Sequence, residues 1–173
     1  MVESLKAHAQ SLAPGLTELF EALHRCPELG RREHRTAALV RARLDALGIE
    51  YVPLADTGAA AIIRGGKPGR TIGFRADMDA LPITEETGLP YASENPGAMH
   101  ACGHDFHTAS LLGAAELLLA RREELAGNVK LFFQPDEEDR GGAADMIAAG
   151  CMEAPRVDAM LCCHVESLIP PGT

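Results

Sequence analysis

Residues 105–135 read DFHTASLLGAAELLLARREELAGNVKLFFQP. The first part, up to residue 122, is rich in alanine and leucine, which predicts a helix. The second part, residues 128–134, is a short apolar run that stops at Pro135. Because proline cannot donate to a strand ladder, this run predicts a buried strand with a defined end. A helix followed closely by a buried strand is typical of an α/β domain.

Two further helices are expected before this segment. Residues 5–23 have apolar residues at helical spacing, with an interruption at Pro14-Gly15. Residues 33–47 form an amphipathic pattern, and Gly48 follows at the position of a C-cap glycine.

The remaining elements complete an alternating pattern. Residues 59–64 and 71–76 are short apolar runs that predict a β-hairpin or two neighbouring strands. A helix is expected at residues 142–149 and a last strand at residues 157–165. We therefore expect an α/β fold with a mixed, mostly parallel sheet and helices on both faces.

Composition excludes several classes of function. The chain has 173 residues and a net charge of −9, and it lacks the basic surface that nucleic-acid binding needs. No stretch is apolar enough to suggest a membrane span, and no secretory signal is visible at the N-terminus. The five cysteines are irregularly spaced, which favours reduced thiols and a cytoplasmic location.

The segment His100-Ala101-Cys102-Gly103-His104-Asp105-Phe106-His107 is dense in possible metal ligands. Cysteine and histidine hold borderline-soft ions such as Zn²⁺, and Gly103 lets Cys102 and His104 face one point. Asp105 could cap the following helix and orient an imidazole. Capping and buried polar packing would explain one of these residues but hardly the whole cluster.

Asp77 and Asp79 directly follow a predicted strand. If the strand geometry continues, side chains two residues apart point the same way, so both carboxylates would face one site. Taken alone, such a pair is more commonly two solvated acids in a turn.

Residues 136–139 are four consecutive acids at the end of the strand that Pro135 terminates. Neighbouring carboxylates repel one another unless they are solvated or hold cations. The turn could bring Glu137 and Glu138 to different parts of one site, one as a base and the other as a metal ligand. An acidic surface loop is the alternative.

Cys162-Cys163-His164 lies at the end of the last predicted strand. His164 could add an imidazole from a neighbouring strand end, although a single histidine there is more often a core residue. Open α/β sheets place ligands at the carboxyl ends of their strands, so all four motifs are expected at one edge.

These motifs resemble, in the same order and over nearly the whole chain, the M20 metallopeptidase superfamily. The resemblance is to its amidohydrolase branch, which includes hippurate hydrolases, N-acyl-amino-acid amidohydrolases and auxin-conjugate hydrolases. The matching segments are residues 23–29, 75–82, 99–105, 133–138 and 164–165.

The resemblance implies a site with two divalent metal ions, Zn²⁺ or Mn²⁺, with Co²⁺ or Ni²⁺ also possible. The implied metal ligands are Cys102, His104, Glu138 and His164. Glu137 matches the general base, and Asp79 is expected to be a second catalytic carboxylate. The residues expected to support the ligands are Asp77, Asp105 and His107.

The resemblance also implies a zinc-exopeptidase-like catalytic domain, of which residues 1–173 would be the N-terminal part. The lid or dimerisation domain and the C-terminal part of the catalytic domain would be absent, so we expect weak or no activity from this chain alone. The full-length form is expected to be a homo-oligomer. Cys26 and Phe106 depart from the usual family pattern, and Phe106 could reshape the substrate pocket.

The implied reaction is hydrolysis of the amide bond of a small N-acyl amino acid. Alternatives within the superfamily are a dipeptidase, a carboxypeptidase or an N-acetyl-diaminopimelate deacetylase. An inactive metal-binding fragment is the non-enzyme alternative. A nucleotide-binding domain is disfavoured because neither glycine-rich phosphate-binding motif follows a strand.

Overall fold

The computed structural model describes residues 2–139, 141–166 and 169. A five-stranded sheet with the order β1-β2-β4-β3-β5 forms its centre. The helices are α1 (Val2–Arg25), α2 (His34–Leu47), α3 (His104–Leu119), the 3₁₀ turn η1 (Arg122–Glu124) and α4 (Gly142–Ala148). The strands are β1 (Glu50–Leu54), β2 (Gly58–Arg64), β3 (Lys67–Asp77), β4 (Ala126–Gln134) and β5 (Ala159–Cys162).

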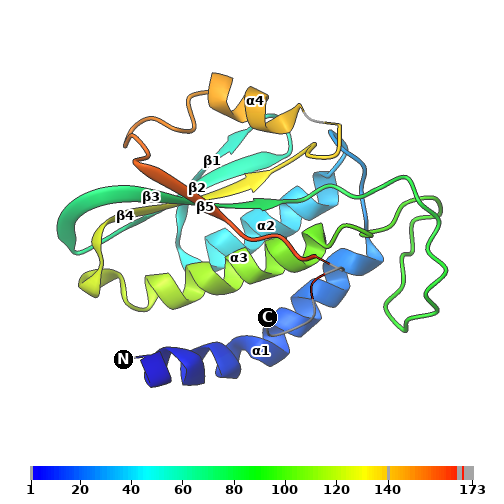
Figure 1. Ribbon diagram of the computed structural model, residues 1–173, viewed down its shortest axis with the longest axis horizontal. Coiled ribbons are helices and arrows are strands. Elements are labelled where there is room, and N and C mark those ends of the chain that lie inside the picture. The colour runs from blue at the N-terminus through cyan, green and yellow to red at the C-terminus, as the bar shows by residue number, and fades with distance from the viewer. Residues whose placement is uncertain (1, 140, 167–168, 170–173) are drawn as a thin grey trace.

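The sheet is mixed, as expected, with helices on both of its faces. Strand β4 pairs antiparallel with β2 and parallel with β3, β3 pairs parallel with β5, and β1 pairs antiparallel with β2. Figure 1 shows α4 on one face and α2 and α3 on the other, with α1 lying outside α3. The parallel pairings are β3–β4 and β3–β5, and these three strands carry the site described below.

The expectation that residues 59–64 and 71–76 form a β-hairpin or two neighbouring strands is wrong. Strand β4 lies between β2 and β3, and Val129 of β4 is paired with Ile63 on one side and Ile72 on the other. Six successive positions of β4, from Val129 to Gln134, are buried. This apolar strand takes the centre because both of its faces can then leave water.

Two details of the predicted elements also differ. Strand β1 was not expected, because it is a largely exposed edge strand with Pro53 and no apolar alternation. Helix α1 continues through Pro14. Leu16, just beyond that proline, packs so closely on Gly113 that a Cβ there would lie 2.6 Å from its Cδ1 atom. Packing on α3 thus offsets the cost of proline in a helix, about 3 kcal/mol.

The main hydrophobic core lies between the sheet and helices α2 and α3. Val40, Leu44, Leu112 and Leu131 are fully buried within it. A smaller cluster on the other face centres on Phe132 and lies under α4. None of the described helices is long and apolar enough to cross a membrane.

Leu131→Ala is expected to lower the free energy of unfolding by about 2–5 kcal/mol, because a fully buried leucine leaves a cavity in a close-packed core. Ile147→Ala on α4, where the side chain is 58% exposed, is the matched control and should stay within about 0.5 kcal/mol of the parent chain. Urea denaturation followed by circular dichroism measures both. Equal losses in the two variants would contradict this description of the core.

Candidate metal centre

The predicted site residues gather at the carboxyl ends of the parallel strands. Strand β3 ends at Asp77, which pairs in register with Gln134 at the end of β4. Helix α3 begins at the same edge with His104, directly after Gly103. Gly103 has a φ of 83°, and a Cβ there would lie 2.4 Å from a methyl carbon of Val165. Glycine is therefore required at this turn by conformation and by space.

Cys102, His104 and Glu138 form a compact set of possible ligands. One ligand atom from each lies within 4.8 Å of the other two, and His104 Nε2 is 3.8 Å from Glu138 Oε1. His164 joins them, with its Nε2 atom 3.5 Å from Cys102 Sγ. The four residues implied to be ligands thus lie close together, although they come from three separate segments of the chain.

Two ligand atoms in this set are buried but unsatisfied. His104 donates its Nδ1–H to the carbonyl oxygen of Asp79 at 2.8 Å, so the lone pair of the neutral ring is on its Nε2 atom. Among the described residues, His104 Nε2 and Glu138 Oε1 have no hydrogen-bond partner. Buried polar atoms are rarely left unpaired, so both atoms fit metal coordination.

The Cys102 thiol lies in a strongly acidic environment. Burial raises its pKa to about 12, and the nearby carboxylates of Glu138, Asp77 and Glu137 contribute to the increase. The thiolate form therefore needs a nearby positive charge. A divalent cation would supply that charge, and the donor set of sulfur, imidazole and carboxylate is typical of Zn²⁺.

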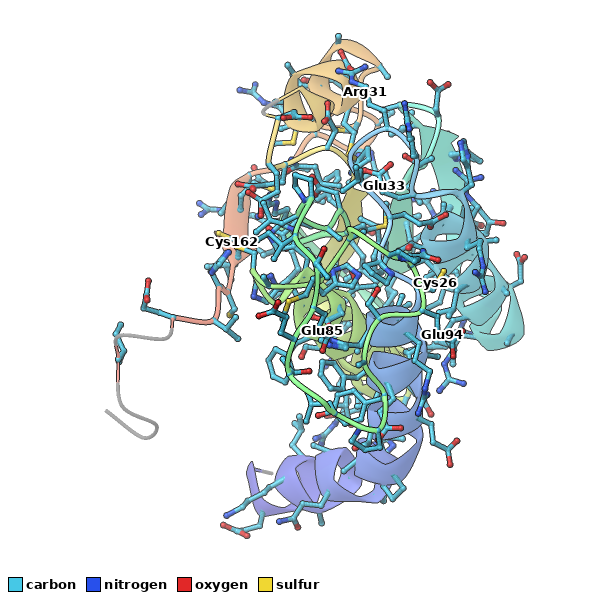
Figure 2. All side chains as sticks on the ribbon, turned by 90° about the vertical axis from the view of Figure 1, so that its right-hand side faces the viewer. Cys26, Arg31, Glu33, Glu85, Glu94 and Cys162 are labelled. Carbon is cyan, nitrogen blue, oxygen red and sulfur yellow. The ribbon has the colours of Figure 1, made fainter. Side chains whose placement is uncertain are left out.

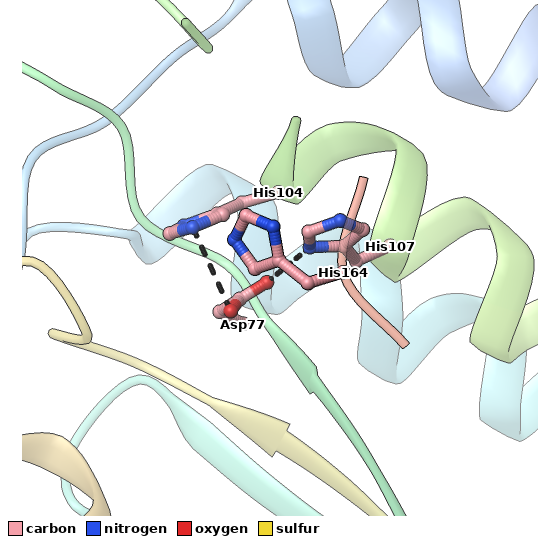
Figure 3. A group of neighbouring side chains, drawn as sticks. All are labelled: Asp77, His104, His107 and His164. Carbon is pink, nitrogen blue, oxygen red and sulfur yellow. Dashed lines mark hydrogen bonds and ion pairs between the residues drawn. The ribbon is translucent and has the colours of Figure 1, made fainter. Parts of the chain in front are cut away.

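His107 and Asp77 form a neighbouring pair with a different role (Figure 3). His107 Nδ1 donates to Asp77 Oδ1 at 2.6 Å, and His107 Nε2 accepts the backbone N–H of Val165 at 2.9 Å. The other Asp77 oxygen accepts from Arg75 at 2.6 Å. Both ring nitrogens of His107 thus have hydrogen bonds, so His107 positions its surroundings and keeps no ring lone pair free.

The pKa of Asp77 is lowered to about 2. Burial acts in the opposite direction and is outweighed by the hydrogen bond from His107 and by the charges of His104 and Arg75. Asp77 is therefore a carboxylate throughout the physiological range. It gives the imidazole side of the site a fixed negative charge.

Asp79 lies beneath the ligands and connects two of them. Its Oδ2 atom accepts the backbone N–H of Glu138 at 3.0 Å, and its carbonyl oxygen accepts from His104. Burial raises its pKa, but the His104 imidazole and the N–H groups of Glu138 and Glu137 outweigh burial, so the pKa is lowered. Asp79 is 1% exposed, so it lies below the surface of the site and holds the backbone of Glu138 in place.

Glu137 lies on the same turn, next to Glu138. It is partly exposed, its backbone N–H faces Asp79, and its carboxylate helps to raise the pKa of the Cys102 thiol. The Glu137 side chain therefore lies at the edge of the group of possible ligands, Cys102, His104 and Glu138, and is open to solvent. A base that exchanges protons with a bound water needs such a position.

The sequence assigned no role to His24 and Glu85. His24 on α1 donates to Asp105 at 2.6 Å, and its other ring nitrogen lies 3.2 Å from Glu85 on the long loop after β3. Figure 2 shows Glu85 on this loop. Asp105 also accepts the N–H of Phe106. His24 stood within a motif of the resemblance, but only the fold places it beside Asp105.

His100 is buried, and neither of its ring nitrogens has a hydrogen-bond partner in the described part of the chain. Burial lowers its pKa to about 4, so the imidazole is neutral at physiological pH. It lines a cavity of about 450 Å³ together with Cys102, His164 and Phe106. The cavity therefore lies beside two of the possible ligands, Cys102 and His164.

Comparison with known proteins agrees with this geometry. The family described as "Peptidase family M20/M25/M40" matches residues 73–173. The chain is 42% identical to Thermostable carboxypeptidase 1 of Saccharolobus solfataricus, with 99% of this chain and 44% of that protein covered. It is 45% identical to N-acetyl-L-cysteine deacetylase of Bacillus subtilis, with 99% and 41% covered.

A solved structure shares the fold. The Bacillus subtilis YXEP protein, described as a dinuclear metal-binding peptidase from the M20 family, is 42% identical with a TM-score of 0.86. The alignment covers 95% of this chain and 45% of that chain. The chain thus spans less than half the length of these relatives.

His24→Gln is expected to remove a pH-dependent part of the stability. Burial opposes protonation of His24, but its hydrogen bonds and charge interactions with Asp105 and Glu85 raise its pKa above 6.5. Protonated His24 therefore stabilises the fold below pH 6.5, and this contribution is lost as the pH rises through the raised pKa.

The difference in melting temperature between the parent chain and His24→Gln should be largest near pH 6 and should shrink towards pH 9. Thermal melts at several pH values measure it. The same substitution at His34, which is exposed on α2, is the control. A difference that is independent of pH would contradict the proposed charge on His24.

Proposed function

The chain belongs to peptidase family M20/M25/M40, and we propose that it is the N-terminal part of a catalytic domain that hydrolyses an amide bond with metal-activated water. The proposal depends on one observation: His104 Nε2 and Glu138 Oε1 are buried 3.8 Å apart, and neither has a hydrogen-bond partner among the described residues. We propose Cys102, His104, Glu138 and His164 as ligands of two divalent metal ions.

The donor types favour particular metals. Thiolate and imidazole suit Zn²⁺, and the carboxylate also suits Mn²⁺, with Co²⁺ and Ni²⁺ as alternatives. The YXEP relative is described as dinuclear, which supports two ions here.

Divalent ions held by these residues would lower the pKa of a water to about 7 and would act as a Lewis acid on the carbonyl oxygen. Glu137 is the proposed general base, which takes a proton from the attacking water and delivers it to the leaving nitrogen. Asp79 fixes the backbone of Glu138 and the tautomer of His104, so we propose that its part in catalysis is indirect.

We propose a small N-acyl amino acid as the substrate. The deacetylase relative is named for an N-acetyl amino acid, and the cavity beside Cys102 is of a size for a small molecule. The carboxypeptidase relative keeps a peptide substrate open as the second candidate. A panel of N-acetyl amino acids and free dipeptides, assayed for released amine, distinguishes the two.

Cys102→Ala is expected to weaken zinc binding by about tenfold or more, because it removes the sulfur ligand of the proposed site. Titration of the metal-free chain against a zinc indicator measures the affinity and the stoichiometry. Cys26→Ala is the matched control, since Cys26 is also partly buried but lies outside the ligand cluster. Unchanged zinc affinity in Cys102→Ala would exclude Cys102 as a ligand.

Glu137→Gln is expected to keep its metal and to lower turnover by about 10²–10⁴-fold, which is the usual contribution of a general base. Turnover of an N-acetyl amino acid by the full-length protein, with metal content measured in parallel, tests both parts. Glu94→Gln, on the loop after β3, controls for loss of surface charge. A variant with undiminished turnover would show that another group is the base.

A further inference from the structure

Asp136 has an unusual backbone conformation next to the two functional glutamates. Its φ is 51°, in the left-handed region that residues with a side chain rarely adopt. It is 2% exposed and immediately precedes Glu137 and Glu138. Such a conformation persists only where the surrounding contacts enforce it, and it often marks a functional site.

Glu33 supplies one of these contacts from a distant part of the chain. Its Oε1 atom accepts the backbone N–H of Asp136 at 2.8 Å, and its Oε2 atom accepts the Thr57 hydroxyl at 2.7 Å. The Glu33 side chain is completely buried. Figure 2 shows Glu33 just below Arg31, near α4. Each carboxylate oxygen thus has one neutral donor, and one of these donors belongs to the strained turn.

The side chain of Asp136 is enclosed as well. Arg31 pairs with Asp136 Oδ2 at 2.8 Å and with Asp145 of α4 at 3.0 Å. A Cβ at Gly30 would lie 2.4 Å from Asp136 Oδ1, and one at Gly141 would lie 2.5 Å from Oδ2. The segment around residues 30–33 is therefore shaped closely around this one aspartate.

The opposite end of the turn is held in the same way. Asp79, which is also buried, accepts the N–H of Glu138 at 3.0 Å. Two buried carboxylates thus bind the backbone N–H groups of Asp136 and Glu138, and Glu137 lies between them. The backbone of this turn has little freedom, so the starting points of both glutamate side chains are fixed.

We infer that Glu33 is a positioning residue, which fixes the turn at Asp136 and thereby sets the positions of Glu138 and Glu137 in the metal centre. The inference rests on the proposed function, because it assigns the two glutamates to metal binding and catalysis. Glu33 thereby has a role in the site although it lies outside residues 73–173, the segment that the family model matches.

Glu33→Met and Glu33→Gln separate positioning from simple stability. Methionine is similar in size but accepts no strong hydrogen bond, so the buried N–H of Asp136 is left unpaired. Glutamine keeps an acceptor for Asp136, and its NH₂ group can donate to the Thr57 hydroxyl. Thr57→Val is a further control, because it removes the other donor to Glu33 and leaves the contact with Asp136 intact.

The first measurement is amide hydrogen exchange in the metal-free chain, followed by NMR. Glu33→Met should speed exchange at Asp136 by about tenfold, the effect of one lost hydrogen bond, while Glu33→Gln and Thr57→Val stay near the parent rate. The second measurement is zinc affinity, which should fall by about tenfold in Glu33→Met and be restored in Glu33→Gln.

If Glu33→Met does not fold, Arg31→Ala tests the same turn. This variant is expected to fold, because the Arg31 side chain is 60% exposed. It should also speed exchange at Asp136 and weaken zinc binding. Asp145→Ala is the control, since it removes only the second partner of Arg31.

Parent-like exchange at Asp136 together with parent-like zinc affinity in Glu33→Met, or in Arg31→Ala if that variant replaces it, would overturn the inference. A parent chain that takes up no zinc would instead contradict the proposed function. In that case the exchange rates at Asp136 still decide whether Glu33 holds the turn.

Discussion

The parallel pairing of β3 with β4 is the constraint on which the site depends. It places Asp77 opposite Gln134, so the segments that follow the two strands leave the sheet at the same edge. Arg75 reinforces this register by donating both to Gln134 and to Asp77. A shift of one residue would turn every side chain of β4 to the other face, so the buried sheet also fixes where the acidic turn begins.

The balance of charge at this edge explains why a cation is proposed. Asp77, Glu137 and Glu138 lie near the Cys102 thiol, and burial together with these three carboxylates raises the pKa of the thiol. The imidazoles divide into two kinds by hydrogen bonding. Both ring nitrogens of His107 have hydrogen bonds, whereas Nε2 of His104 has none among the described residues and lies 3.8 Å from Glu138. Histidine thus serves as a supporting residue at position 107 and is available as a metal ligand at position 104.

The N-terminal segment contributes more than packing. His24 binds the aspartate that follows His104, and Glu33 binds the turn that carries the two glutamates. Both residues lie before the segment matched by the family, residues 73–173. Ligands that are held by distant, fully buried partners lose little freedom when they bind a metal, which favours tight and specific coordination.

The sequence alone predicted most of the helices and strands and the types of side chain that gather at the candidate site. Helical periodicity, the apolar run that Pro135 ends and the dense segment at residues 100–107 are local patterns. The strand order, the edge strand β1 and the contacts of His24 and Glu33 came only from the tertiary structure. The physical reason is that strand pairing and contacts between residues 81 and 103 positions apart depend on which surfaces become buried together. No local sequence pattern encodes that choice.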